Sequence, residues 1–282
     1  MLHILDARTG EPVPAAPARR GLTRIQAHAR RLDPTALRVL ITADLLVRAL
    51  ELGGTPVWTI LTSPRDHAEL RTAATRLAIR PFEDAHDLAS GLGESQAIHV
   101  AQRGAGNTLG EGPVVGVGDV EWPGAGAGAG AGAGPGAGAG AAVAGGRFAA
   151  GDARGTSDPA GPSPLPVLLS DPSALRLALL AVPRSEPVRL DPAALEDAAG
   201  NLARWRRAVA GWARQPSRPV PGEVRERLRA AWEDDLDLPA VLGVLRDVES
   251  APGLADGARF ETFAYADRLL ALDLVRDIGG AG

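Results

Sequence analysis

Residues 33–61 read DPTALRVLITADLLVRALELGGTPVWTIL, and this stretch decides the fold of the first half of the chain. Its opening Asp-Pro pair predicts a helix start, because aspartate caps free backbone amides and proline fits the first helical turn. Apolar residues then recur at helical spacing until a Gly-Gly pair ends the helix. Residues 56–61 follow as a buried strand. Helix and strand in this order predict a parallel α/β sheet.

The segments on either side extend this pattern. Residues 2–5 are a short strand candidate ahead of the helix, and residues 65–78 predict a second helix after the buried strand. Strands alternating with helices at this spacing are typical of a Rossmann-like domain. We therefore assign residues 1–122 to a reduced Rossmann-like domain.

A Gly-Ala tract divides the chain. It begins near residue 123, and Ser, Pro and Gly continue it as far as residue 166. Such a tract buries little side-chain area and is costly to order. The composition predicts a disordered, Gly/Ala/Pro-rich linker over residues 123–166.

The remaining segment, residues 167–282, is predicted to be an all-α bundle. Asp171-Pro172 and Asp191-Pro192 repeat the helix-start signal. Apolar side chains recur at helical spacing after the second of these signals; they are Leu195, Ala199, Leu202, Trp205, Val209 and Trp212. Further helices are expected near residues 221–233, 237–249 and 257–275. The predicted class is thus α/β, with the Rossmann-like half joined to a helical bundle.

Composition excludes some functions. The formal net charge of −4 gives no general reason to expect DNA or a membrane as partner. No apolar stretch is long enough to cross a bilayer, and residues 1–6 lack the features of a signal peptide. These observations predict a cytoplasmic protein.

Two residue types are missing. The chain contains no cysteine, so disulfides and thiolate metal sites are excluded. It also contains no lysine, because all 30 basic residues are arginine. Chemistry that needs a compact ammonium group therefore has no side chain to perform it.

Several segments resemble the family of cysteinyl-tRNA synthetases and mycothiol-pathway cysteine ligases. In the second half, residues 234–240 (DDLDLPA) resemble the family's "DDLDTPRAL" turn and helix, and residues 266–274 (ADRLLALDL) its closing "LLGLDL". Residues 171–180 and 201–206 are similar to two further helices of the same domain. The likeness is stronger because these segments occur in order and at family-like spacing.

The first half carries the same likeness. Residues 4–10 (ILDARTG) look like the family's "YDTRTG", and residues 77–81 (LAIRP) look like "LGIRP". Arg38 and Asp44 match the helix that follows the family's "HIGH" motif. The resemblance implies a class I, nucleotide-binding synthetase fold over about residues 1–100 and 165–275.

The catalytic motifs that the resemblance implies are missing or altered. The "HIGH" histidines of the family hold ATP phosphates at a helix N-terminus, but that position here is Asp33-Pro34-Thr35-Ala36. The "KMSKS" lysines would fall near residues 151–155, where Arg154 takes the place of the second lysine. Thr35 and Arg154 are therefore the only candidates for contact with a nucleotide.

No zinc is expected, although the family senses the cysteine thiol through zinc held by Cys and His. The five histidines, which are His3, His28, His67, His86 and His99, show no metal-ligand spacing. We expect each of them to have an isolated surface or capping role.

A basic patch in the second half is a candidate RNA-binding surface. It consists of Arg204, Arg206, Arg207, Arg214 and Arg218, with no acidic residue between Asp197 and Glu223. Arginine combined with aromatic residues suits single-stranded RNA. The alternative is a solvated helix face, with the two tryptophans of this segment in the core.

Three functions are consistent with the sequence. The first is a catalytically silent paralogue, a pseudoenzyme, that acts by binding an unknown protein or tRNA. The second is an active ATP-dependent cysteine ligase, of the cysteinyl-tRNA synthetase or mycothiol-ligase type, in which Arg154 and an altered pocket replace the lost motifs. The third is a tRNA-binding module. We rank the second below the first, because losing the lysines and histidines removes transition-state stabilisation.

Overall fold

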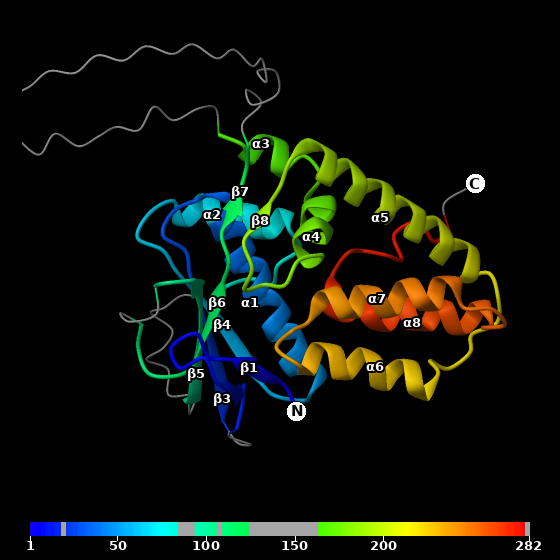
Figure 1. Ribbon diagram of the computed structural model, residues 1–282, viewed down its shortest axis with the longest axis horizontal. Helices are drawn as coiled ribbons and strands as arrows, with labels where there is room; N and C mark the ends of the chain where they lie inside the picture. Colours follow the sequence, from blue (N-terminus) through cyan, green and yellow to red (C-terminus); the bar gives the residue numbers. More distant parts are fainter. Residues whose placement is uncertain (18–20, 84–93, 106–108, 124–162, 280–282) are drawn as a thin grey trace, which may run out of the picture.

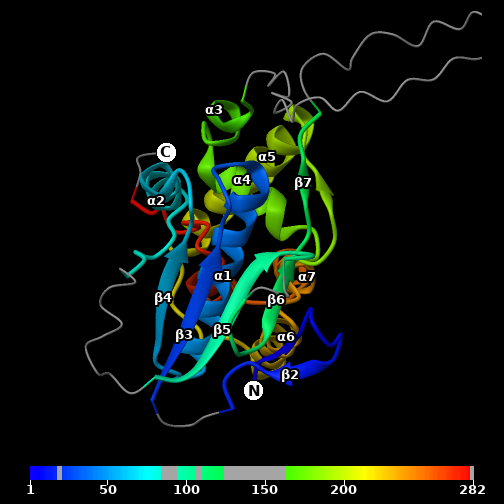
Figure 2. The ribbon, with the colours of Figure 1, turned by 90° about the vertical axis from the view of Figure 1, so that its left-hand side faces the viewer.

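A computed structural model describes residues 1–17, 21–83, 94–105, 109–123 and 163–279 (Figure 1). Its centre is a parallel four-stranded sheet in the order β4-β3-β5-β6. The strands are β3 (Leu22–His28), β4 (Val57–Thr62), β5 (Glu94–Gln102) and β6 (Val114–Val117). Helix α1 (Pro34–Leu52) packs along β3 and β5, as Figure 2 shows, and α2 (His67–Arg76) follows β4. The α/β prediction for this half is confirmed.

The strand that precedes α1 differs from the predicted one. Residues 3–5 do form a strand, β1 (His3–Leu5), but it pairs antiparallel with β2 (Pro12–Pro14) in a separate sheet. The strand of the βαβ unit is β3, in which buried Thr23, Ile25 and Ala27 alternate with half-buried residues. Sequence analysis missed it because three of its four half-buried positions, Arg24, Gln26 and His28, are polar, which hides the apolar run expected of a parallel strand.

Helix α1 is buried almost all round, because it lies between the sheet and the helical half. Asp33 caps it by accepting a hydrogen bond from the Ala36 amide at 2.8 Å, and Pro34 occupies the first turn. Gly53 ends it, as the sequence predicts. The helix contacts β3, β4 and β5 on one side and α8 on the other.

The second half is helical, as predicted. After the short α3 (Leu165–Leu168), its helices are α4 (Pro172–Leu180), α5 (Pro192–Trp212), α6 (Gly222–Glu233), α7 (Leu238–Ser250) and α8 (Asp256–Leu270). Leu202, Trp205 and Val209 are buried, whereas Trp212 is half-buried; both tryptophans pack edge-on against Phe263. The predicted apolar stripe of α5 is therefore confirmed, with Leu202, Trp205 and Val209 in the core and Leu195, Ala199 and Trp212 half-buried against it.

The two halves are joined by backbone pairing and buried charge. Strands β7 (Val120–Glu121) and β8 (Val188–Arg189) pair in parallel, one from each half. Arg176 on α4 is 1% exposed and donates a hydrogen bond to Asp44 on α1 at 2.5 Å. The buried apolar residues of both halves form a single cluster. Most of the predicted linker, residues 124–162, lies outside the described residues.

Arg38 is a second buried connection between the halves. Its guanidinium, 2% exposed, donates to four backbone carbonyls, one at Gly118 and three between Val182 and Glu186. Burial lowers the pKa of Arg38 to about 10, so the side chain stays charged at neutral pH. Both family-like residues of α1, Arg38 and Asp44, thus hold the two halves together.

Within the described ranges, no helix has the length and apolar character that a membrane span requires.

Candidate functional site

A large cavity lies at the carboxyl edge of the parallel sheet. It has a volume of about 800 Å³ and is lined by the last residues of three strands, which are His28 of β3, Thr62 of β4 and Gln102 of β5. The chain passes from β3 through α1 to β4 on one side, while β5 pairs with β3 on the other. This reversal of strand order is the place where open α/β sheets bind ligands. We refer to it as the edge cavity.

The start of α1 forms one wall of the edge cavity. Asp33, Thr35 and Ala36 all line it. The Asp33 carboxylate already accepts the Ala36 amide, and the Thr35 hydroxyl accepts the Val120 amide at 2.9 Å. The helix N-terminus, with its positive end, therefore carries a carboxylate of the protein itself at the place where an incoming anion would bind.

Arginines form another part of the wall. Arg30, Arg31 and Arg65 line the cavity, and Arg31 also lies 3.3 Å from an Asp33 carboxylate oxygen. Guanidinium groups suit carboxylate and phosphate because they can donate two hydrogen bonds side by side. These three residues give the edge cavity a positive side that the sequence motifs did not indicate.

Two histidines meet beside this cavity. His28 Nε2 lies 2.9 Å from His99 Nδ1, and His99 Nε2 lies 3.0 Å from the carbonyl oxygen of Glu111. His99 is 2% exposed, whereas His28 is half-buried and faces the cavity. Burial, His99 and Arg24 together lower the pKa of His28 to about 4. The expectation of isolated histidines is wrong for this pair, because sheet register brings together residues 71 positions apart.

No group of three or more His, Cys, Asp or Glu side chains suited to a metal ion occurs in the part of the chain that the structure describes. Of the predicted nucleotide contacts, Thr35 lies in the edge cavity, with its hydroxyl engaged by Val120. Arg154 and His86 lie outside the described residues.

The predicted basic patch is divided by the fold. Arg206 is 9% exposed and donates to the carbonyls of Leu272 and Asp273, so it belongs to the interior. Arg204 pairs with Glu249, which also accepts from the buried Trp205 indole. Arg207, Arg214 and Arg218 are exposed. Arg206 is thus not available for nucleic-acid contact, and Trp205 is packed in the core rather than stacked on a base.

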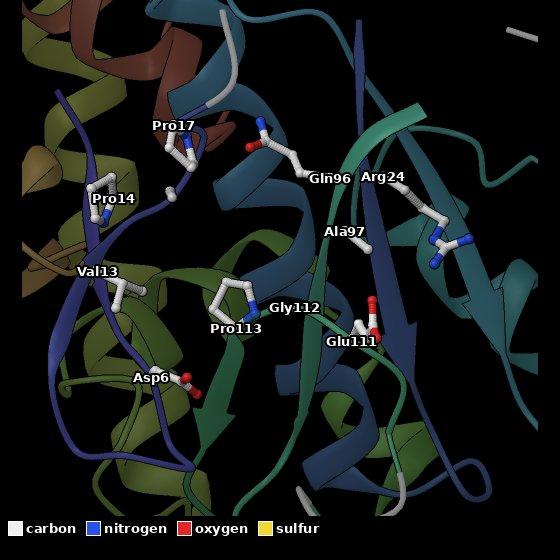
Figure 3. A pocket seen from close by; sticks show the side chains of 11 residues that line it. Asp6, Val13, Pro14, Pro17, Arg24, Gln96, Ala97, Glu111, Gly112 and Pro113 are labelled. Atoms are coloured by element: carbon white, nitrogen blue, oxygen red, sulfur yellow. The ribbon is translucent and has the colours of Figure 1, made fainter. Parts of the chain in front are cut away.

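A second cavity, of about 610 Å³, lies between the β1–β2 hairpin and β5 (Figure 3). Its polar side chains are largely engaged: Asp6 accepts from the amides of Arg8 and Val114, and Gln96 donates to Thr23. Gly112 closes its floor with a φ of +113°, where a Cβ would collide with the Ala97 carbonyl oxygen. We take the edge cavity as the candidate functional site, because it is lined by Arg30, Arg65 and the half-buried His28, whose side chains are available to a ligand.

Fold and site together define a Rossmann-like α/β protein with a ligand cavity at its sheet edge and a helical half packed against it. No protein-family model matches the chain. It is, however, similar to three curated proteins, each named L-cysteine:1D-myo-inositol 2-amino-2-deoxy-alpha-D-glucopyranoside ligase.

These relatives come from three organisms. The protein of Parafrankia sp. (strain EAN1pec) is 43% identical over 89 residues, covering 32% of this chain and 19% of the relative. That of Thermobispora bispora is 39% identical over 92 residues (30% and 22%), and that of Streptomyces griseus subsp. griseus is 37% identical over 108 residues (37% and 25%). The chain thus spans only about a fifth to a quarter of the length of the curated relatives it matches. The likeness supports a relationship to the cysteine ligases.

Proposed function

We propose that this chain is a catalytically silent relative of the cysteine-activating ligases and acts by binding a partner. The observation that carries this proposal is the start of α1. A nucleotide phosphate at this helix would need the amides of its first turn, and the Ala36 amide is already bonded to the Asp33 carboxylate at 2.8 Å. A phosphate placed there would also face the negative charge of Asp33.

The composition of the chain supports the same conclusion. Adenylate formation requires positive charge to stabilise the pyrophosphate leaving group, which the family supplies with lysines. This chain has no lysine, and it has no cysteine with which to hold a thiol-sensing zinc. The side chains that hold its two halves together are present, so the fold persists without the machinery of the reaction.

The test is cysteine-dependent ATP–pyrophosphate exchange by the full chain. We expect exchange no higher than that of a heat-killed control, and no zinc retained after purification in metal-free buffer. A matched variant, Asp33→Ser, keeps a capping oxygen but removes the negative charge. Exchange by the unmodified chain that exceeds the control and is lost in Arg154→Ala would overturn the proposal.

An ATP-dependent cysteine ligase is the second candidate. It is favoured by Arg30, Arg31 and Arg65, which line the edge cavity and could neutralise phosphate charge in place of lysines. If this candidate is correct, the chain exchanges pyrophosphate, and Arg65→Gln reduces the rate sharply. Calorimetric titration with ATP is the quickest discriminator, because a ligase must bind ATP whereas a silent paralogue need not.

A tRNA partner is favoured by three exposed arginines, which are Arg207 on α5 and Arg214 and Arg218 in the segment that follows it. Affinity for tRNA that falls steeply with salt, with a slope reduced by Arg214→Ala, would support it. If the variant with Ala at all three of these positions binds tRNA as tightly as the unmodified chain does, the result would point instead to a protein partner.

A further inference from the structure

His99 fixes the proton positions of the histidine pair. The carbonyl oxygen of Glu111 can only accept a hydrogen bond, so His99 Nε2, at 3.0 Å, must carry a proton. His99 is 2% exposed, and burial disfavours a charged imidazole. Neutral His99 has only this one ring proton, so its Nδ1 is a bare acceptor.

The acceptor on His99 in turn determines the state of His28. A hydrogen bond of 2.9 Å joins His28 Nε2 to His99 Nδ1, so the proton in this contact must belong to His28. Neutral His28 then has a bare Nδ1. That nitrogen has no hydrogen-bond partner among the residues that the structure describes, and His28 lines the edge cavity.

Arginines provide the complementary group on the same cavity. The side chains of Arg30 and Arg65 make no hydrogen bond or ion pair within the described ranges, while Arg31 lies against Asp33. The edge cavity thus combines guanidinium donors with one fixed imidazole acceptor. Such a pairing selects ligands by two chemically opposite groups.

We propose that the edge cavity binds a small anionic molecule that also carries an amino or hydroxyl group, with the anion held by Arg30 and Arg65 and the donor group held by His28 Nδ1. His28 is then a specificity-determining residue, and its tautomer is fixed by the hydrogen bonds that link it to His99 and His99 to Glu111. This proposal rests on the proposed function, because it assumes that the edge cavity binds its ligand without catalysing a reaction. It specifies the class of ligand, which the binding role alone does not.

The tautomer is tested directly by long-range ¹H–¹⁵N correlation spectra of the imidazole rings in the full chain at pH 7. We expect both His28 and His99 to be neutral and protonated at Nε2, with His28→Gln used to assign the signals. A His28 ring that is charged, or protonated at Nδ1, would overturn the proposal whatever the binding data show. Exchange activity does not enter this result, so it is independent of the catalytic test.

The ligand class is tested with two isosteric probes, O-phosphoethanolamine and propyl phosphate, titrated by calorimetry. The first carries an ammonium group where the second has a methyl group. We expect O-phosphoethanolamine to bind about tenfold more tightly, as for a hydrogen bond with a charged donor. Arg65→Gln should weaken both probes.

Two variants separate a binding role of His28 from a structural one. His28→Leu should abolish the difference between the probes while leaving the affinity for propyl phosphate. His28→Gln can still donate to His99 and accept from the ligand, so it should retain part of the difference. His3→Gln, on the distant β1 strand, is the matched control and should change nothing. Absence of binding by both probes, or equal affinity for them in the unmodified chain, would overturn the ligand class.

Discussion

Two neighbouring parts of α1 show how differently one helix can be used. Its first turn, with Asp33 and Thr35, borders the edge cavity, whereas Arg38 and Asp44 hold the helical half in place. Arg38 and Asp44 lie where the sequence resembles the cysteine ligases, whereas Asp33 and Thr35 lie where that resemblance leads one to expect phosphate-binding histidines. The comparison teaches that the family-like residues of this helix are among those that connect the two halves of the chain.

Among the mutations considered, loss of the buried Asp44–Arg176 pair between the two halves should lower stability the most. Asp44→Ala leaves the guanidinium of Arg176 buried without its counter-charge, and losing one partner of a buried pair costs about 3–5 kcal/mol of unfolding free energy. Urea denaturation measures the change. Arg227→Ala, which breaks the exposed pair with Asp247, is the control and should cost less than about 1 kcal/mol. Equal losses of unfolding free energy in the two variants would mean that the buried Asp44–Arg176 pair contributes no more than an exposed one.

The basic patch should divide in the same way. Arg206→Ala removes hydrogen bonds to the carbonyls of Leu272, which is buried, and Asp273, so we expect the unfolding free energy to fall by about 1–3 kcal/mol. Arg207→Ala, at the next position, should change stability by less than about 0.5 kcal/mol, because that side chain is exposed. Thermal unfolding of the two variants compares them directly. An Arg206→Ala protein as stable as Arg207→Ala would contradict the interior role.

Removing the Asp33 carboxylate from the first turn of α1 should lower stability and strengthen anion binding. Asp33→Ala removes the cap on Ala36, which costs about 1 kcal/mol. It also frees an amide at the positive end of the helix, so inorganic phosphate should bind more tightly than to the unmodified chain. Calorimetry and urea denaturation follow both effects in one protein. Unchanged phosphate affinity would show that the carboxylate does not block the site.

The histidine pair should give the smallest effect, seen in the pH dependence of stability. His28 has a folded-state pKa of about 4, below its unfolded value, so the unfolded chain binds more protons between the two. The contribution of His28 is therefore complete above about pH 6.5 and is lost as the pH falls toward 4. On acidification, we expect the unfolding free energy to fall less in His28→Gln than in the unmodified chain. The difference should be on the order of 1 kcal/mol, because solvent screens the half-buried imidazole. Identical pH profiles would show that His28 is not held neutral.

Local signals in the sequence predicted much of this fold. Aspartate-proline pairs at residues 33, 171 and 191 mark the starts of three helices, and each aspartate makes its capping bond. These signals work because a cap involves residues only three positions apart. Strand β3 and the histidine pair depend instead on the register between distant strands. Gln26 pairs with His99 and His28 with Ala101, an alignment that no local pattern encodes.

Arg38 has a further consequence for folding. Its four carbonyl partners come from both sides of the Gly-Ala tract, so the side chain can be satisfied only when both parts of the chain are in place. Lysine could not replace it, because an ammonium group has three donors and no planar fork. Partial opening at this point would leave the buried guanidinium of Arg38 without its carbonyl partners. Amides of α1 and of the segment around Val182 should therefore exchange with solvent together, as one cooperative unit.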